Sequence, residues 1–576
     1  MVLTKRTLKI TLLVMILSIS GIAYDAMAQN HCLDTGFIPA NHGEAGFPRS
    51  MPLPGPAPFW SITEVVSTES TGSACRPTVV VDDDHTVHVV WYDFTEGAGI
   101  GNPCILYRSK PKGGAWNPAE LVSSESDISS AQPHMAISAA GTVHVVWWDT
   151  SDYGGSGTDG DIFYKYKPKG GDWSETEVVT LDGTPTNEIL SSVIAGLDDR
   201  VHVIWVEVVS NNYHFYYKQR NPAGVWSDPE PVFLEDRLNS FGASLALDSL
   251  GTLHMAWDIQ IDSYGNNKWE ILYKSRTAEG IWTDLEIVST ESTSAKGHPS
   301  LTVGSDLTLH ITWSDHTDLN GCGIDKDIFY KKKPYGEAWT TTEVVSVESD
   351  GSSNHSHLMI GPDATLHLTW SEVNYSPPDR NIYYKYRLKG CDWSSPERVS
   401  TESDSDIQSS DPSIAIDTDG VVHVAWEDWA DYQGSGESPD IFYKQKASPL
   451  WADGFVLPIR TGGSIHFFLN TDTENAYRNY ILLAGVTGID PGTSLPGGAA
   501  VLPLNWDPLT DLIAQFVNLP PFSGFLGTFD SEGRANASLD IPGPISCGFT
   551  GPVFFAFAVA DPWNYASNPL VIELVD

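Results

Sequence analysis

Three pairs of aspartates recur at one spacing and could bind a metal ion. The pairs are Asp149 with Asp161, Asp315 with Asp327, and Asp428 with Asp440. Two carboxylates that face each other repel unless a cation or a proton lies between them, and their hard oxygen atoms suit calcium. The sequence therefore predicts calcium in at least one of these Gly-, Ser- and Asp-rich loops. None is an EF-hand loop, so the alternative is that the carboxylates are solvated or cap loop backbone. No other cofactor is predicted.

A set of histidines also recurs, one in each copy of a repeated segment. Its members are His88, His144, His202, His254, His310, His367 and His423. The ligands of one metal ion must all lie within ~2.1 Å of it, which residues from equivalent positions of different repeats cannot do. We expect each histidine to form hydrogen bonds inside its own repeat. The Tyr-Lys and Tyr-Arg pairs, such as Tyr164-Lys165, are expected to be structural too.

The repeat itself is marked by eight tryptophans spaced 53 to 58 residues apart. They are Trp60, Trp116, Trp173, Trp226, Trp282, Trp339, Trp393 and Trp451. Each interval holds four short runs rich in β-branched and aromatic residues, bounded by Gly, Ser, Asp or Pro, which is typical of strands. Such a four-stranded unit is apolar on both faces, so neighbouring units must cover it.

These patterns predict an all-β protein with a seven-bladed β-propeller of four-stranded blades over residues 59–450. The three inner strands occur seven times, which sets the blade number. The run at 62–67 precedes the first inner triplet, so we expect it to complete the last blade and close the ring. Residues 451–576 lose the period but still alternate and turn, which predicts a C-terminal β-sandwich module.

Residues that break the repeat are the best candidates for a site, because an active site is asymmetric. Those on the loops that enter the inner strands are Arg76, His298 and His355, with His357 close by. Those on the loops that follow the second inner strand are the aromatic residues Tyr153, Tyr375, Trp429 and Tyr432. We predict that these residues bind a ligand at a mouth made strongly acidic by carboxylates such as Glu69 and Asp93.

The turn before each repeat tryptophan resembles a known family motif. SKPKGGAW (109–116), SRTAEGIW (275–282) and KKPYGEAW (332–339) keep the serine or lysine, Gly and Trp spacing of the Asp-box, but Pro111, Thr277 and Pro334 replace its Asp. The chain therefore resembles sialidase-like propellers with BNR repeats, across roughly residues 60–450. In that family the Asp-box is a structural turn, and catalysis uses three arginines. No such arginine cluster can be recognised here, so the resemblance implies no catalytic residue.

The composition limits the partners. The 74 acidic and 33 basic residues give a formal net charge of -41, which would repel nucleic acid. Lys5, Arg6 and Lys9, then an apolar run and Ala26-Met27-Ala28, predict a cleaved signal peptide at 1–28; the alternative is a retained membrane anchor. Residues 29–58 would form an extended leader. No later stretch is a candidate membrane span, so we expect a secreted, cell-surface or periplasmic monomer.

Export would permit disulfides among the six cysteines, and Cys75 with Cys104, in one repeat, is the predicted pair. The function we expect is binding of glycan or extracellular protein through the acidic loop face, without catalysis. The alternative is a glycan-processing enzyme, either a sialidase-like glycoside hydrolase or a polysaccharide lyase. An acid/base pair within ~5 to 10 Å would favour the enzyme, whereas a mouth lined only by repeat-equivalent residues would favour binding.

Overall fold

A computed structural model describes residues 60–95, 103–180, 186–235, 239–260, 269–294, 296–349, 351–375, 378–402, 408–436, 438–471, 473–543 and 550–576. The signal peptide and leader expected at 1–58 lie outside the described residues. Two compact units are separated at Lys446. We call Trp60–Lys446 the ring unit and Ala447–Asp576 the C-terminal unit.

The described residues of the ring unit form seven four-stranded antiparallel sheets, as the repeat requires. Three of them are β2 (Ala74–Val81), β3 (Val87–Asp93), β4 (Cys104–Lys110), β5 (Glu120–Leu121); β6 (Ser130–Ile137), β7 (Val143–Asp149), β8 (Asp161–Lys167), β9 (Glu177–Val178); and β10 (Asn187–Ala195), β11 (Val201–Val209), β12 (Asn212–Arg220), β13 (Glu230–Phe233). Three more are β14 (Ala243–Leu247), β15 (Leu253–Gln260), β16 (Trp269–Arg276), β17 (Glu286–Ile287); β18 (Lys296–Val303), β19 (Leu309–Asp315), β20 (Asp327–Lys333), β21 (Glu343–Val344); and β22 (Ser352–Ile360), β23 (Leu366–Tyr375), β24 (Pro378–Arg387), β25 (Glu397–Arg398).

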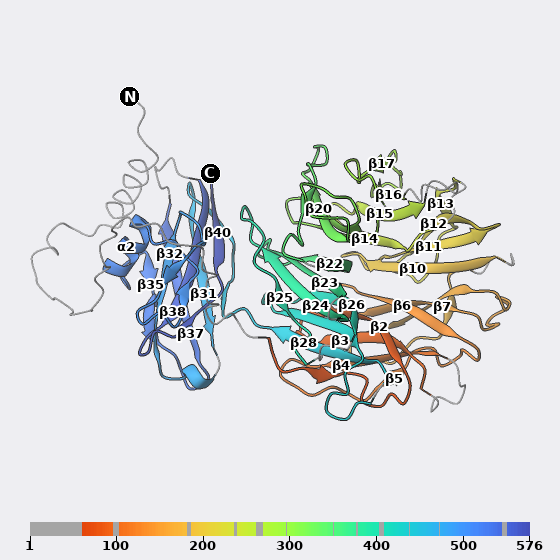
Figure 1. Cartoon of the computed structure of the whole chain (residues 1–576), viewed down its shortest axis with the longest axis horizontal. Helices are drawn as coiled ribbons and strands as arrows, with labels where there is room; N and C mark the ends of the chain where they lie inside the picture. The colour runs from red at the N-terminus through yellow and green to blue at the C-terminus, as the bar shows by residue number, and fades with distance from the viewer. Residues whose placement is uncertain are drawn as a thin grey trace, which may run out of the picture. The chain divides into compact units, whose positions relative to one another are not determined.

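The seventh sheet joins the two ends of the unit. It consists of β26 (Ser409–Ile416), β27 (Val422–Asp428), β28 (Asp440–Lys446) and, at its outer edge, β1 (Glu64–Val65). Glu64 lies opposite Tyr443 and Val65 opposite Phe442, so the pairing expected for 62–67 is present. The first strands of the sheets contact one another in the closed series β2, β6, β10, β14, β18, β22, β26 and back to β2 (Figure 1).

Neighbouring sheets are held together by their apolar faces. Val90, Ile105 and Tyr107 of one sheet share a buried cluster with Met135 and Trp147 of the next. Each repeat tryptophan from Trp60 to Trp393 meets, edge to face, a tyrosine of the preceding sheet, with ring centroids 5.2 to 5.7 Å apart. The tryptophan ladder therefore binds sheet to sheet, which explains the period.

The C-terminal unit is also mostly β. One sheet contains β29 (Leu450–Ala452), β31 (Gly462–Asn470), β37 (Arg534–Pro542) and β35 (Phe522–Ser523); the other contains β30 (Val456–Pro458), β40 (Leu570–Val575), β38 (Gly551–Val559), β32 (Asn479–Gly485) and β36 (Leu526–Thr528), with β39 (Tyr565–Ala566) beside β38. Phe467 of the first sheet contacts Phe555 of the second. The remaining elements are η3 (Thr473–Asn475), β33 (Thr493–Ser494), β34 (Val501–Leu502) and α2 (Pro508–Gln515).

Helix α2 was not expected from the sequence. It begins with a capping box, in which Asp507 accepts from the backbone of Leu509 and Thr510, and Pro508 occupies its first turn. No helix in the described part of the chain is long and apolar enough to cross a membrane.

Candidate functional site

One backbone feature recurs in the first strand of six sheets and orients six side chains. Each of these strands contains a register shift of the β-bulge type, and the residue inside it has a positive φ. With Gly242, just before β14, the seven residues are Arg76, Gln132, Leu190, Gly242, His298, His355 and Asp411. A left-handed conformation is unfavourable for residues other than Gly, and bulges commonly re-aim a side chain next to an active site. We call these the bulge positions.

Four bulge positions on consecutive sheets form one cluster, which we call the bulge cluster: Arg76, His298, His355 and Asp411. The rings of His298 and His355 lie 4.3 Å apart, and Nδ1 of His355 lies 2.5 Å from Oδ1 of Asp411. The charge of Arg76 acts on both Asp411 and His298. The sequence predicted Arg76, His298 and His355 as ligand-binding residues, and the structure brings all three together.

Glu427 of β27 joins the bulge cluster from the seventh sheet. Its Oε2 accepts a hydrogen bond from the backbone N–H of Arg76 at 3.3 Å, and its carboxylate also accepts from the side chain of Trp429. Trp429, another predicted ligand-binding residue, therefore lies beside Glu427 at the edge of the bulge cluster. Its side chain is largely exposed to solvent.

The two carboxylates of the site have opposite pKa shifts. Burial alone would raise the pKa of Asp411, but His355, Arg76 and His298 together lower it to about 2. Burial and the charge of Asp411 raise the pKa of Glu427. Burial, with the neighbouring charges of His355, Lys326 and Arg76, lowers the pKa of His298 to about 3. At neutral pH the site thus holds an ionised Asp411 beside a neutral His298, and Glu427 keeps its proton to a higher pH than Asp411.

An aromatic stack continues the site beyond His298. The ring of Phe241 lies 4.7 Å from that of His298 and 4.8 Å from that of Trp269, nearly parallel to both. Asp258 positions Phe241 and His298, because its carboxylate accepts hydrogen bonds from their backbone N–H groups and from the hydroxyl of Ser240. Asp258 is fully buried, which raises its pKa to about 6.

Two other predicted ligand-binding aromatics, Tyr153 and Tyr432, contact residues of their own sheets. Tyr153 packs on Phe163 and Tyr432 on Phe442, each within its own sheet. Tyr375 ends β23, and its side chain lies outside what the structure describes. Tyr153 and Tyr432 occupy equivalent repeat positions, so their contacts are those of the repeat.

The seven repeated histidines have the structural role expected of them. Nδ1 of each lies 2.6 to 2.8 Å from the hydroxyl of the tyrosine on the next strand, as in the pair His144 and Tyr164. Burial lowers the pKa of His144 to about 4. These imidazoles are therefore hydrogen-bonding groups inside the sheets.

The predicted calcium-binding aspartates lie opposite one another as expected, Asp149 facing Asp161, Asp315 facing Asp327 and Asp428 facing Asp440. Protein donors already surround them. Asp149 accepts from Ser126, Ser130 and the Trp147 indole, and the same indole bond recurs at Asp315 and Asp428. Thr180, Ser346 and Ser67 donate to Asp161, Asp327 and Asp440. Burial raises the pKa of Asp327 and of Asp440.

Glutamates expected to make the loop face acidic are paired with cations. Each lies 2.5 to 2.9 Å from the Lys or Arg that follows the repeated tyrosine of the next sheet: Glu69 with Arg108, Glu125 with Lys165, Glu291 with Lys331, Glu348 with Lys385, and Glu402 with Lys444. The Tyr-Lys and Tyr-Arg pairs thus fasten the loops, and they offset the negative charge of this face.

The predicted disulfide between Cys75 and Cys104 is wrong. Cys75 of β2 lies opposite Tyr92, and Cys104 of β4 lies opposite Asp93, so strand β3 separates the two cysteines. Two strand spacings amount to about 10 Å, which exceeds the ~7 Å limit between the Cα atoms of a disulfide. All four cysteines within the described ranges are free thiols. Burial raises the pKa of the Cys75 thiol.

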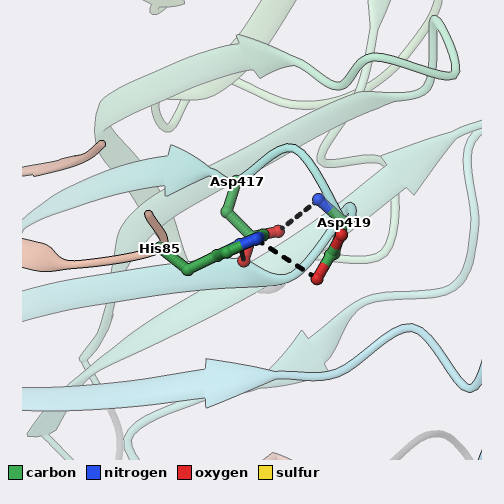
Figure 2. A group of neighbouring side chains, drawn as sticks. All are labelled: His85, Asp417 and Asp419. Atoms are coloured by element: carbon green, nitrogen blue, oxygen red, sulfur yellow. Dashed lines mark hydrogen bonds and ion pairs between the residues drawn. The ribbon is translucent and has the colours of Figure 1, made fainter. Parts of the chain in front are cut away.

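A different group has the spacing of metal ligands. Within the described residues, His85, Asp417 and Asp419 form the one such group, with ligand atoms within 4.8 Å of one another (Figure 2). His85 follows β2 and the aspartates follow β26, so the group bridges the first and last sheets. Nδ1 of His85 lies 2.8 Å from Asp417, and Lys112 lies 2.7 Å from Asp419. Because Lys112 already supplies positive charge, we interpret the group as an ion-pair network between two sheets.

Sequence reasoning missed Asp411, Glu427, Asp258 and Phe241. Asp411 had a usable signal, since Arg76, Gln132, His298 and Asp411 each precede a proline at the same repeat position. Asp258 and Glu427 also share a position, directly after the second-strand tryptophan, where other sheets carry residues such as Tyr92 and Ser314. Both carboxylates accept from the bulge residue of the next sheet, which only the fold reveals.

No protein-family profile and no curated protein matches this sequence. Among solved structures, the chain is similar to an ulvan lyase described as a new polysaccharide lyase family, with 12% identity over 66% of this chain and 95% of that one, and a TM-score of 0.46. It is also similar to a leech intramolecular trans-sialidase (10% identity, 69% of this chain and 70% of that one, TM-score 0.38) and to a Penicillium chrysogenum α-L-arabinanase (11%, 55% and 93%, 0.38). These scores are low, so the function has to be argued from the chain's own residues.

Proposed function

We propose that this protein is a glycan-processing enzyme that cleaves a glycosidic bond at the bulge cluster. We infer that the seven sheets are the blades of a seven-bladed β-propeller and that the two sheets of the C-terminal unit form a β-sandwich. The closed series of first strands and the pairing of β1 with β28 support the propeller. A signal peptide at 1–28 would export the protein to where polysaccharides are found.

The observation that carries the proposal is the bulge cluster itself, in which Asp411 lies against His355 while Glu427 accepts a hydrogen bond from the backbone of Arg76. Asp411 has a pKa of about 2, whereas the pKa of Glu427 is raised, and the charge of Asp411 contributes to that difference. When the environment separates the pKa values of two nearby carboxyl groups in this way, one group serves as the ionised partner and the other as the proton donor. An imidazole, His355, lies against the ionised partner.

The asymmetry of the bulge positions favours catalysis over binding alone. The bulges present Arg, Gln, Leu, His, His and Asp in six sheets, and Gly242 occupies the equivalent repeat position in the seventh. The four charged or ionisable side chains, Arg76, His298, His355 and Asp411, come from consecutive sheets and form the bulge cluster. A repeat that serves only as a scaffold would not need polar, strained residues on one side of the ring.

Each residue then has a role. Asp411 fixes Nδ1 of His355, which leaves Nε2 as the imidazole atom that exchanges a proton with the substrate. Glu427 delivers a proton to the leaving oxygen, and Arg76 stabilises negative charge that develops nearby. In hydrolysis, water is added across the broken C–O bond. In elimination, a proton leaves carbon, a C=C bond forms and the leaving oxygen gains a proton. The cluster suits either reaction.

An assay on a polysaccharide panel tests the proposal. The purified protein would be incubated with alginate, polygalacturonate, chondroitin sulfate, arabinan and xylan, while reducing ends and the ultraviolet absorbance of unsaturated products are followed. We expect cleavage of at least one polymer and loss of at least 100-fold in rate for His355→Gln. His466→Gln is the matched control, because His466 and Asp453 form a similar pair, 2.6 Å apart, in the C-terminal unit. Binding without cleavage would instead identify a glycan-binding module.

A further inference from the structure

The ring unit exposes aromatic side chains at both ends of the bulge cluster. In its described part, the exposed aromatic residues are Phe94, Phe241, Tyr335 and Trp429. Phe241 is 48% exposed and Trp429 46% exposed. Burial of rings of this size is favourable, so an aromatic residue left in water beside a polar cluster indicates a surface that a ligand covers.

Side-chain contacts order these residues into a single line. Phe241 contacts His298, His298 contacts His355, and His355 contacts Asp411. Beyond Asp411 the line continues through Arg76, whose backbone bonds Glu427, to Trp429, whose side chain bonds Glu427. The acid–base groups therefore lie between Phe241 at one end and Trp429 at the other.

Both aromatic residues are held rigidly. Trp269, which is buried, lies almost parallel to Phe241 at 4.8 Å, and Asp258 Oδ1 accepts from the backbone N–H of Phe241 at 2.8 Å. The indole of Trp429 is anchored on Glu427, and its backbone N–H donates to the carbonyl of Gln408. A preorganised aromatic residue loses little conformational entropy when it binds a ligand.

We propose that Phe241 and Trp429 are sugar-binding subsites on opposite sides of the cleaved bond, so that the substrate is a polymer cut internally. This inference rests on the proposed function. Each exposed ring would contact the apolar face of a sugar residue, one on the side of the leaving group and one on the other side. A substrate cleaved only at its end would need a subsite on one side alone.

The test uses the full chain and the polymer that the panel identifies. Viscosity and reducing ends are measured together, since internal cuts lower viscosity before many ends appear. Phe241→Ala and Trp429→Ala are each expected to raise KM for the polymer about tenfold, equivalent to about 1.4 kcal/mol. Tyr335→Ala is the matched control, because Tyr335 is an exposed aromatic residue in the turn before Trp339, outside the line from Phe241 to Trp429. Phe241→Leu and a thermal melt check that the variants fold.

The outcomes separate the two proposals. If the polymer is cleaved and both alanine variants behave like Tyr335→Ala, the subsites are wrong and the enzymatic function stands. If only one variant is affected, or if small sugars are released before viscosity falls, the substrate is held on one side only and internal cleavage is wrong. If the parent protein cleaves no panel polymer, the proposed function fails. If His355→Gln also binds none of these polymers in affinity electrophoresis, the subsites fail with it.

Discussion

Nδ1 of His355 lies 2.5 Å from Oδ1 of Asp411, although the two residues come from β22 and β26 of different sheets. Both have a positive φ, at 50° and 47°, and each sits in the bulge of its strand. The contact therefore depends on two strained backbones aimed at one point. Structures retain such strain where the surrounding fold over-determines it, most often at functional sites.

Because Asp411 would act through His355, the two residues should behave as one catalytic unit. His355→Gln and Asp411→Asn are each expected to lower kcat/KM by about 10² to 10⁴. The double variant should be no worse than the more damaging single variant. Steady-state kinetics on the polymer identified by the panel measure this coupling. Effects that multiply in the double variant would show that the residues act independently.

Buried Asp258 should make stability depend on pH in an unusual direction. Its pKa is about 6 in the folded chain, against an ordinary value of 3.8. From pH 4 to 6 the unfolded chain has released this proton while the folded chain still holds it, so stability falls as pH rises through that window. The shift corresponds to about 3 kcal/mol.

The comparison with Asp258→Asn isolates this group. We expect the unfolding free energy of the wild-type protein, minus that of the variant, to decrease by about 3 kcal/mol between pH 4 and pH 7. Urea unfolding at a series of pH values measures it. Asp284→Asn, at an exposed position, is the control for loss of a charge. A difference that does not change with pH would mean that Asp258 does not titrate in this range.

Strand β1 should be needed for ring stability, unlike the residues that precede it. Val66 is fully buried, its backbone N–H donates to Ile441, and Ser67 donates to Asp440. A chain that starts at Trp60 is expected to keep its melting temperature. One that starts after Ser67 should melt at a lower temperature, because its free energy of unfolding falls by more than about 3 kcal/mol. Equal melting temperatures for the two truncations would contradict a closing role for β1.

The network of His85, Asp417 and Asp419 should stabilise the junction between the first and last sheets. The pKa of Asp417 is lowered because bonds from His423, His85 and Val421 outweigh the effect of burial. The ionised Asp417 carboxylate therefore contributes stability at pH values above its pKa in the unfolded chain. That contribution is lost as the pH falls through its lower pKa in the folded chain. We expect Asp417→Asn to lower the free energy of unfolding by about 1 to 3 kcal/mol at pH 7 and by less below pH 4. A zinc-dependent rise in Tm that His85→Ala abolishes would identify a metal site instead.

Calcium at the paired aspartates can be tested directly. If an ion binds between Asp149 and Asp161, millimolar calcium will raise Tm, and Asn at both positions will remove that response. The hydrogen bonds from Ser126, Ser130 and Trp147 favour the other result, a Tm that calcium and chelator leave unchanged. Differential scanning calorimetry with calcium and with chelator decides between them.

The sequence alone was sufficient for features that depend on local pattern. The period of the tryptophans, the alternation of strands such as 143–149 and the repeated His and Tyr positions predicted the four-stranded sheets and the structural histidines, because a repeat imposes the same contacts on every copy. It also identified Arg76, His298 and His355 as candidate site residues, since residues that differ from the repeat are visible without any structure; that they bind a ligand stays a prediction.

Tertiary structure decided what depends on which sheets are neighbours. Asp411 and Glu427 became site residues only because β26 and β27 close the ring beside β2, more than 300 positions away in the chain. Cys75 and Cys104 were paired because they share one repeat, but the registers of β2 and β4 with β3 place a whole strand between them. The acidic loops proved to be paired with lysines of the next sheet, a contact between repeats that no pattern within one repeat can predict. Local pattern determines what each sheet contains, and the contacts between sheets determine which side chains meet.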